Sequence, residues 1–369
     1  MVINFRDSTP LYQQIVQHIR AQILAGDVQV GDKVPTQHEM AKAYDVSLIT
    51  VKKALAELTR EGILFSRVGK GTYVAQKPIN SKFSKTLTFG LVLRDFDSPY
   101  FSQIVRSVEA SMRVKEGHLL LSTSSNKEEN EDKEIARYRD LGVHGLIIAS
   151  MTRSYKASRA LKQLHNDRFP YVVVSYISDE DINYIGTDHE YGAFLATNHL
   201  LAIGYDKIGY INGEKGNLLG EVRKGGFLKA LKQHGKVFDE QCEFFLDLRG
   251  EWHDYESGYG IGKRFLELSD PPSAMFIYND LAALGFQKAI LDAGLRIPQD
   301  VAIVGFDNIK QGITTAVPLS TIHQPTEEIG QMAVDMLYKT LRGESTENRV
   351  ILKPRLVVRE SCGSQIIER

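Results

Sequence analysis

Three lysines near the start of the sequence stand where positive charge can meet a phosphate backbone. Lys52 and Lys53 are adjacent within LITVKKALAELTR, and Lys70 lies between Gly69 and Gly71. A lysine ammonium group neutralises a phosphate, and glycines let a backbone approach a partner closely. A pair of lysines on a helix is by itself usually a solvated face. Its meaning therefore depends on the elements that hold these residues.

Those elements are three helices, of which the last two are joined by a short turn, and a hairpin. STPLYQQIVQHIRAQILAG carries apolar residues at four-residue spacing, and a shorter helical segment over 37–44 follows Pro35-Thr36. A third helix begins after Ser47, a residue type that caps helix N-termini well. Two short runs, ILFSRV and TYVA, flank the glycine turn and predict a β-hairpin. The region therefore predicts a winged helix-turn-helix whose last helix enters the DNA major groove with its N-terminus first.

Composition limits the protein classes that remain. The chain has 369 residues, 43% hydrophobic and 25% charged, which is ordinary for a globular protein of more than one domain. Its net charge of −1 excludes DNA binding through bulk charge alone. The two cysteines have no metal-ligand spacing, and no signal peptide or long apolar run is present. We expect a cytoplasmic protein with no metal, no cofactor and no membrane contact.

After residue 86 the pattern changes to short apolar runs that alternate with amphipathic helical stretches. The runs are LTFGLVLR, HLLLSTS, GLIIAS, YVVVS, KIGYING, AMFIY and VAIVGF. Such alternation predicts parallel sheets with helices on both faces, and the length of the region predicts two similar halves. Because ligands bind at the carboxyl ends of strands in open parallel sheets, the residues after each run are the candidate site.

Polar and aromatic residues follow several of these runs. They are Ser150, Ser175-Tyr176, Arg223, Trp252, Asn279, Asp280, Asp307 and Asn308. One aromatic platform with arginine, amide and carboxylate groups suits a small neutral polyhydroxylated ligand, because the ring packs on C–H groups while the polar groups bind hydroxyls. Asp280 is interpreted as the cap of the helix after it, and the scattered histidines 189, 199 and 323 as structural.

The first region resembles the winged-helix domain of the GntR family of bacterial regulators. The resemblance implies DNA contacts at His38, Ser47, Leu48, Thr50, Lys52, Lys53, Gly69, Lys70 and Gly71. Two positions depart from the family, which usually has arginine where His38 and Leu48 stand. Since arginine is the usual reader of guanine edges, Leu48 favours either contact with a thymine methyl group or a differently aligned helix.

The second region resembles the effector domain of LacI/GalR-type repressors, which has the periplasmic sugar-binding fold. SPYFSQI, VRKGGFLKAL and LSTIHQPTEEIGQMAV are among the matching segments. The joining of both domains is similar to arabinose repressors of the AraR type. The resemblance implies ligand contacts at Tyr100, Phe101, Ser150, Arg223, Trp252, Asn279 and Asp307. Residues 76–86 lack the pattern of the LacI/GalR hinge helix, so coupling is expected to run through dimer geometry.

The predicted organisation is an α+β winged helix over 1–76, a linker over 77–86 and an α/β sensing domain over 87–369, of the periplasmic-binding-protein-like type I. Its first parallel-sheet subdomain is predicted over about 87–187 and 319–347, and its second over about 188–318 and 348–369. Segment 325–342 predicts a helix with an apolar face that packs on its own sheet. By the resemblance, part of it also forms the dimer seam.

We expect a homodimeric, sugar-responsive repressor that a small sugar such as L-arabinose releases from double-stranded operator DNA. An activator, or a sensor of a nucleoside or purine, stays open. A fusion to a pyridoxal-phosphate enzyme requires a Schiff-base lysine and a larger domain, and an all-helical acid sensor disagrees with the strand-rich pattern. A glycosidase requires paired carboxylates, for which Asp97 and Asp307 are available without an evident acid–base environment. We therefore expect no enzyme activity.

Overall fold

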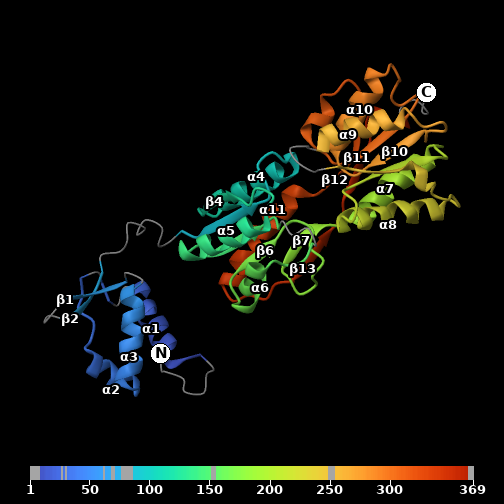
Figure 1. Ribbon diagram of the computed structural model, residues 1–369. Coiled ribbons are helices and arrows are strands. Elements are labelled where there is room, and N and C mark those ends of the chain that lie inside the picture. Colours follow the sequence, from blue (N-terminus) through green and yellow to red (C-terminus); the bar gives the residue numbers. More distant parts are fainter. Residues whose placement is uncertain are drawn as a thin grey trace. The chain divides into compact units, whose positions relative to one another are not determined.

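The protein is described by a computed structural model that covers residues 9–25, 28–29, 31–60, 63–67, 71–75, 86–150, 155–247 and 254–364. It divides into two compact units, Met1–Thr86 and Leu87–Arg369 (Figure 1). The predicted linker, 77–86, lies outside the described residues apart from Thr86.

The first unit is a small helical domain with a hairpin. Its elements are α1 (Leu11–Ala25), α2 (Gln37–Tyr44), α3 (Leu48–Arg60), β1 (Leu64–Arg67) and β2 (Gly71–Val74). The two strands are antiparallel. The four-residue apolar spacing in α1 and α3 buries one face of each helix, and the shared core is Ile15, Val16, Ile19, Val34, Met40, Val51, Ala54, Leu55, Leu58, Leu64 and Val74. The predicted winged-helix architecture is thereby confirmed.

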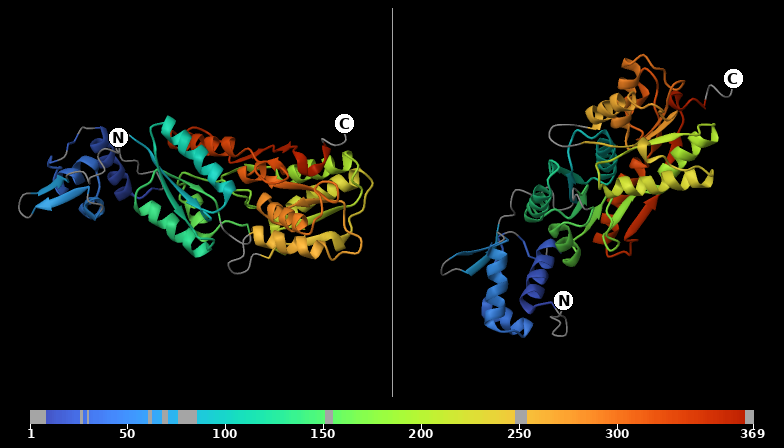
Figure 2. Two further views of the ribbon diagram at one scale, coloured as in Figure 1. Left: turned by 90° about the horizontal axis from the view of Figure 1, so that it is seen from above. Right: turned by 45° about the vertical axis from the view of Figure 1, so that its right-hand side comes forward.

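Lobe one of the second unit is a six-stranded parallel sheet with helices on both faces (Figure 2). Its strands, in spatial order, are β13 (Arg349–Leu352), β7 (Tyr184–Thr187), β6 (Tyr171–Val173), β5 (Gly145–Ile148), β3 (Thr88–Leu93) and β4 (His118–Thr123). One face packs on α4 (Pro99–Val114) and α11 (Thr326–Leu341). The other packs on α5 (Glu128–Asp140) and α6 (Arg159–Asn166).

Lobe two repeats this design. Its strands, in spatial order, are β14 (Arg355–Val357), β12 (Ser320–His323), β11 (Ala302–Asp307), β10 (Ala274–Ile277), β8 (Ile208–Asn212) and β9 (Glu243–Phe245), and only β14 is antiparallel to its neighbour. One face carries α7 (His189–Ala202) and α8 (Leu218–Gln233), and the other carries α9 (Asp254–Phe265) and α10 (Asp280–Asp292). Short 3-10 helices are η2 (Glu240–Cys242), η3 (Lys310–Ile313) and η4 (Glu360–Cys362).

The chain crosses between the lobes three times, and two crossings differ from the prediction. β12 was predicted in subdomain one, but it pairs with β11 of lobe two. β13 was predicted in subdomain two, but it pairs with β7 of lobe one. The crossings therefore follow Thr187, His323 and Leu352. The sequence pattern could not reveal this, because a short strand of four residues can pair with either sheet.

Polar residues at the carboxyl ends of the strands cap the helices that follow. The Ser98 side chain accepts a hydrogen bond from the Phe101 backbone N–H, and Asp188 does the same for Tyr191. Each cap satisfies one backbone donor that the first helical turn leaves without a partner. Much of the polar character at this edge of the sheets therefore has a local structural cause, and the ligand-facing groups must be separated from it residue by residue.

Candidate DNA interface and ligand cleft

The first turn of α3 is held by a capping interaction that the sequence predicts. The Thr50 backbone N–H donates to the Ser47 Oγ at 3.2 Å. The same oxygen lies 2.7 Å from the Thr50 hydroxyl. Ser47 and Thr50, both predicted to contact DNA, therefore also fix the start of α3. Their hydroxyl groups are already hydrogen-bonded to each other within the domain.

The exposed side of α3 is apolar at its N-terminal end and basic beyond it. Leu48 and Ile49 are 42% and 79% exposed, and Lys52 and Lys53 are both exposed. The Lys53 ammonium lies 3.8 Å from the centre of the Tyr12 ring of α1, a cation–π contact. The two lysines thus differ, since Lys53 is drawn toward α1. The sequence analysis did not select Ile49, although its place beside Leu48 was a signal.

The remaining predicted DNA contacts lie on α2 and the hairpin. His38 is exposed in the first turn of α2. Gly71 opens β2 with a φ of 113°, a backbone conformation that favours glycine over residues with a side chain. Gly69 and Lys70 lie outside the described residues.

In lobe two, Arg223 of α8 is buried between two aromatic rings. It is 3% exposed, and its guanidinium carbon lies 3.7 Å from the Phe306 ring centre and 4.6 Å from that of Tyr278. Its Nη1 donates to the Tyr278 carbonyl oxygen, and its Nη2 lies 3.3 Å from His189 Nδ1. Burial, and then Arg223, hold the pKa of His189 well below its ordinary value. His189 is therefore a neutral acceptor for the guanidinium.

Asp307 ends β11 in an unusual backbone conformation. Its φ is 124°, a strained value for a residue with a side chain. Gln324 Nε2 donates to its Oδ1 at 2.6 Å. Burial raises the pKa of Asp307 to about 8, and Arg223 acts in the opposite direction. Strain and an elevated pKa in one carboxyl group are typical of a functional position.

Asn279 and Asp280 differ from the sequence analysis in which of the two caps α10. The cap of α10 is Asn279, whose Oδ1 accepts from the Ala282 N–H at 2.9 Å. Its Nδ2 donates to Asp254 Oδ2 at 2.7 Å, which leaves one amide hydrogen for a ligand. The interpretation of Asp280 as the cap is therefore wrong. Trp252, just before Asp254, lies outside the described residues.

Asp280 is a fully buried structural carboxylate. It is 0% exposed and accepts from the Thr321 hydroxyl at 2.6 Å and from the Ile309 backbone N–H at 2.9 Å. Burial raises its pKa to about 6, although both hydrogen bonds favour the charged form. All of these contacts lie within lobe two, so Asp280 connects β10, β11 and β12.

Lobe one contributes the three other predicted ligand residues at different depths. Tyr100, in the first turn of α4, is partly buried and packs its ring edge-on against Phe101 at 5.1 Å. Phe101 is 7% exposed and belongs to the apolar core, so it supports Tyr100 from beneath. Ser150 is also 7% exposed, and its hydroxyl donates to Glu131 Oε1 at 3.2 Å.

The two lobes place these groups against one another. Burial, then Tyr184 and Asp307, raise the pKa of Tyr100, and Arg223 lowers it, so Tyr100 lies within electrostatic range of both residues of the other lobe. Tyr278 behaves similarly, because burial and the neighbouring Tyr155 of lobe one raise its pKa. We call the following residues the cleft: Tyr100, Tyr155, Arg223, Tyr278 and Asp307, together with their neighbours His189, Gln324 and Asp254. It lies at the carboxyl ends of both sheets, as the sequence predicts.

Two buried polar atoms beside the cleft have no hydrogen-bond partner among the described residues. They are the Nε of Arg223 and the Oε1 of Gln324. One is a donor and the other is an acceptor. Because a buried polar group without a partner destabilises the fold, this pair favours a ligand whose groups both donate and accept. A hydroxyl group does both. The sequence analysis missed Gln324, Tyr278, His189 and Asp254 as cleft residues.

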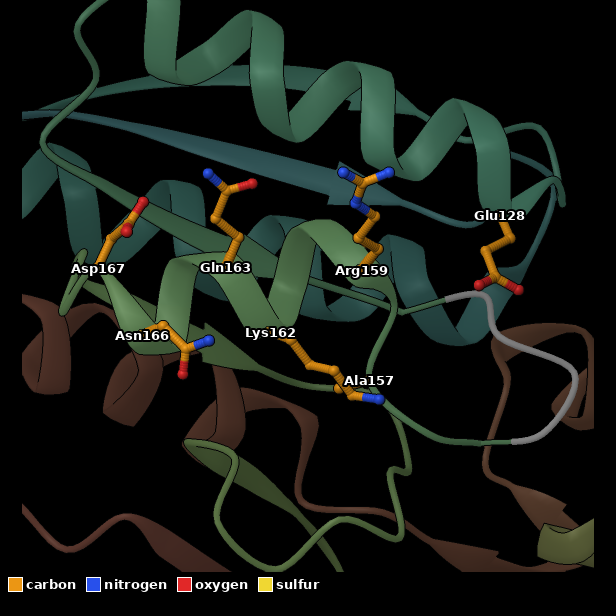
Figure 3. A pocket seen from close by; sticks show the side chains of 7 residues that line it. All are labelled: Glu128, Ala157, Arg159, Lys162, Gln163, Asn166 and Asp167. Atoms are coloured by element: carbon orange, nitrogen blue, oxygen red, sulfur yellow. The ribbon is translucent and has the colours of Figure 1, made fainter.

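The structure also has two surface hollows, of which the smaller is lined by Pro99 and Ser102 on either side of Tyr100 and Phe101. The larger, of about 670 Å³, is on α6 and is lined by charged and amide side chains such as Arg159, Lys162 and Asn166 (Figure 3). These side chains point in different directions, and no aromatic ring lines the hollow. The smaller, of about 410 Å³, lies between α4 and η3. Neither contains a predicted ligand residue.

No metal site and no membrane-spanning helix were found in the described ranges. The His, Cys, Asp and Glu side chains there form no cluster suited to a metal ion. None of the helices described is long and apolar enough to cross a bilayer. Both cysteines, Cys242 and Cys362, are free thiols and buried.

Two family models match separate parts of the chain. Residues 11–74 match the bacterial regulatory proteins of the gntR family. Residues 197–362 match a periplasmic binding protein-like domain. The first match covers the winged helix, and the second covers most of lobe two together with α11 and the last strands.

Individual proteins match over nearly the whole chain. An arabinose metabolism transcriptional repressor of Geobacillus stearothermophilus is 32% identical over 362 residues, covering 95% of this chain and 97% of that protein. The HTH-type transcriptional repressor PurR of Pasteurella multocida is 28% identical over 344 residues, covering 90% and 99%. The crystal structure of a LacI family regulator from Enterococcus faecium with bound ribose has 26% identity and a TM-score of 0.64, covering 74% of this chain and 98% of that chain. The chain belongs to the family of bacterial transcriptional repressors, including the arabinose metabolism repressors, that join a GntR-type DNA-binding domain to a periplasmic-binding-protein-like effector domain.

Proposed function

We propose that this protein is a homodimeric cytoplasmic repressor whose affinity for operator DNA is lowered by a neutral monosaccharide, L-arabinose or a close relative, bound in the cleft. The observation that carries the proposal is the pair of buried, unpartnered atoms on Arg223 and Gln324. Neighbouring hydroxyls of a sugar satisfy both atoms, because each hydroxyl donates and accepts. The ring of Tyr100 offers a surface for sugar C–H groups. The arabinose repressor relative supports the same ligand class.

The proposed mechanism uses the three crossings between the lobes. A ligand that contacts Tyr100 in lobe one and Arg223 or Asp307 in lobe two favours the arrangement in which those residues are close. In a dimer, a change in the angle between lobes alters the spacing of the two winged helices, so both half-sites are no longer matched at once. A coupling free energy of about 1–3 kcal/mol between sugar and DNA is expected, as in other allosteric proteins.

Thermal unfolding of the full chain with L-arabinose, D-ribose and hypoxanthine tests the ligand class. At 100 times its dissociation constant, a ligand adds about 2.7 kcal/mol to the stability of the folded state. We expect a shift with one sugar, its loss in Arg223→Met, and its retention in Asp270→Ala, which alters only an exposed ion pair. A shift with hypoxanthine alone would instead favour a purine sensor.

DNA binding is tested separately, by anisotropy with labelled duplexes from the promoter region of the gene itself. We expect saturable binding that the active sugar weakens, and weaker binding by Lys52→Ala, because one contact to a phosphate is lost. Sugar-strengthened binding would contradict release by the sugar. Absence of binding to every promoter duplex, together with no enrichment of any sequence from a randomised duplex pool, would contradict the assignment as a DNA-binding repressor.

A further inference from the structure

The outward side of α3 forms one continuous stripe. With about 100° between successive residues of a helix, the buried positions Val51, Ala54, Leu55 and Leu58 gather on one side. The exposed positions gather on the opposite arc and are Leu48, Ile49, Lys52, Lys53, Ala56 and Thr59. A partner that meets the first turns of this helix therefore touches these side chains and few others.

The chemistry of this stripe is unusual for a helix that reads DNA. Bidentate contacts to guanine or adenine come from arginine, lysine, asparagine or glutamine. Of these types the stripe has only Lys52 and Lys53, and the Lys53 ammonium is placed over Tyr12. At the N-terminal end, which enters the groove first, the side chains are those of Leu48 and Ile49. The hydroxyl groups of Ser47 and Thr50 at the same end are 2.7 Å apart and already hydrogen-bonded to each other, so the apolar contacts of the first turn fall to Leu48 and Ile49.

The major groove offers one apolar group on its base edges. It is the C5 methyl of thymine, since the other positions there are hydrogen-bond donors or acceptors. We propose that Leu48 and Ile49 are the specificity-determining residues of α3 and that they contact the methyl groups of thymines in each half-site. The inference rests on the proposed role as a DNA-binding repressor, and it adds which bases are read and by which contacts.

Exposure and charge favour DNA over another occupant. A single exposed apolar side chain is ordinary, but Ile49 at 79% and Leu48 at 42% are adjacent and lie at one helix end. The exposed Lys52 on the same stripe supplies the cation that a phosphate backbone requires. A second protein copy bound through this face would have to bury that ammonium group as well.

The test begins with selection of bound sequences from a duplex pool with a randomised centre, using the full chain. Each thymine of the enriched site is then replaced in turn by uracil, which removes only the methyl group. We expect binding to weaken about fourfold at one or two thymines per half-site, the effect of one buried methyl-sized group. The other thymines should be insensitive.

Matched variants assign each methyl group to its residue. In Leu48→Ala and in Ile49→Ala, the duplexes with thymine and uracil should bind equally at the position that the missing side chain contacts. Both variants should keep the wild-type thermal midpoint, because the side chains are exposed. Lys52→Ala is the control, since it should weaken thymine and uracil duplexes alike and reduce the slope of log affinity against log salt by about one.

The inference is overturned if uracil at every thymine leaves binding by the wild-type chain unchanged, or if the penalties persist unchanged in both alanine variants. It is also overturned if Ile49→Ala changes the self-association measured by sedimentation without DNA while the thymine methyl groups do not affect binding. Ile49 would then contact a second copy of the protein. If no sequence is enriched at all, the proposed DNA-binding function fails and this inference falls with it. If a site is enriched but no thymine methyl group affects binding to it, this inference is contradicted while the proposed DNA-binding function stands.

Discussion

Affinity for the sugar should increase with pH between about 6 and 8, because Asp307 must lose a proton before it can accept hydroxyl hydrogens with both oxygens. Burial raises the pKa of this carboxyl group to about 8 in the unliganded protein. Arg223 lowers that pKa, whereas Asp280 and Asp254 raise it, and Gln324 donates to the charged form. At pH 7 only about one molecule in ten is then ionised, a deficit of about 1.4 kcal/mol.

The sign follows from linkage. A sugar that binds the ionised carboxylate lowers its pKa, so binding below pH 8 releases a proton. The dissociation constant should therefore be about tenfold larger at pH 7 than at pH 9, about a hundredfold larger at pH 6, and flat above pH 8. His189 does not contribute, because its pKa is well below its ordinary value and it stays neutral throughout this range.

Titration calorimetry with L-arabinose at pH 6, 7, 8 and 9, in two buffers of different ionisation enthalpy, measures the dissociation constant and the number of protons released. The buffer dependence of the heat should correspond to nearly one proton released per chain at pH 7 and none at pH 9. Asp307→Asn should bind more weakly at pH 9 and show no pH dependence. Equal affinity at pH 6 and pH 9 without proton release would refute the assignment of Asp307 as an ionised acceptor.

Two further predictions concern stability and use neighbouring or conservative variants as controls. Gly226→Ala should destabilise the second unit by more than about 3 kcal/mol, because a Cβ there would lie 1.9 Å from the Glu190 carbonyl oxygen. Gly225→Ala, whose Cβ would meet nothing within 4 Å, should stabilise α8 by about 0.5–1 kcal/mol, and urea unfolding of both variants checks the contrast. Thr321→Val should lower stability by about 1–3 kcal/mol by removing the donor to buried Asp280. Thr321→Ser, which keeps the hydroxyl, should lose less stability than Thr321→Val. Equal urea midpoints for these two variants would contradict the role of the hydroxyl as a donor to Asp280.

Local patterns made the elements predictable, whereas contacts between distant segments did not follow from them. The cap at Ser47 and the apolar faces of α1 and α3 need only near neighbours in the chain, so the winged helix could be predicted. The assignment of β12 and β13 to lobes depends on which sheet edge each strand reaches. No property of the four residues of either strand, STIH in β12 and RVIL in β13, specifies that edge.

The candidate site shows the same limit. Arg223 and Asp307 could be selected because a charged residue after an apolar strand is conspicuous. Gln324 and Tyr278 could not, since an amide and a tyrosine are common in every context. Gln324 belongs to the site because it donates a hydrogen bond to Asp307, and Tyr278 because its carbonyl oxygen accepts one from Arg223. Asn279 and Asp280 are adjacent and both suited to capping, so only the structure distinguishes them.

The conformation of Asp307 is set by residues that the ligand never needs to touch. Asp280 accepts from the Ile309 N–H, two residues beyond Asp307, and the Thr321 hydroxyl both donates to Asp280 and accepts from the Asn308 N–H at 3.3 Å. These bonds hold the turn in which residues 307 and 308 have φ values of 124° and 58°. Because a strained turn persists only where its surroundings determine it, the buried Asp280–Thr321 pair is a positioning element. Its loss should therefore weaken sugar binding as well as stability, even though neither side chain is placed in the cleft.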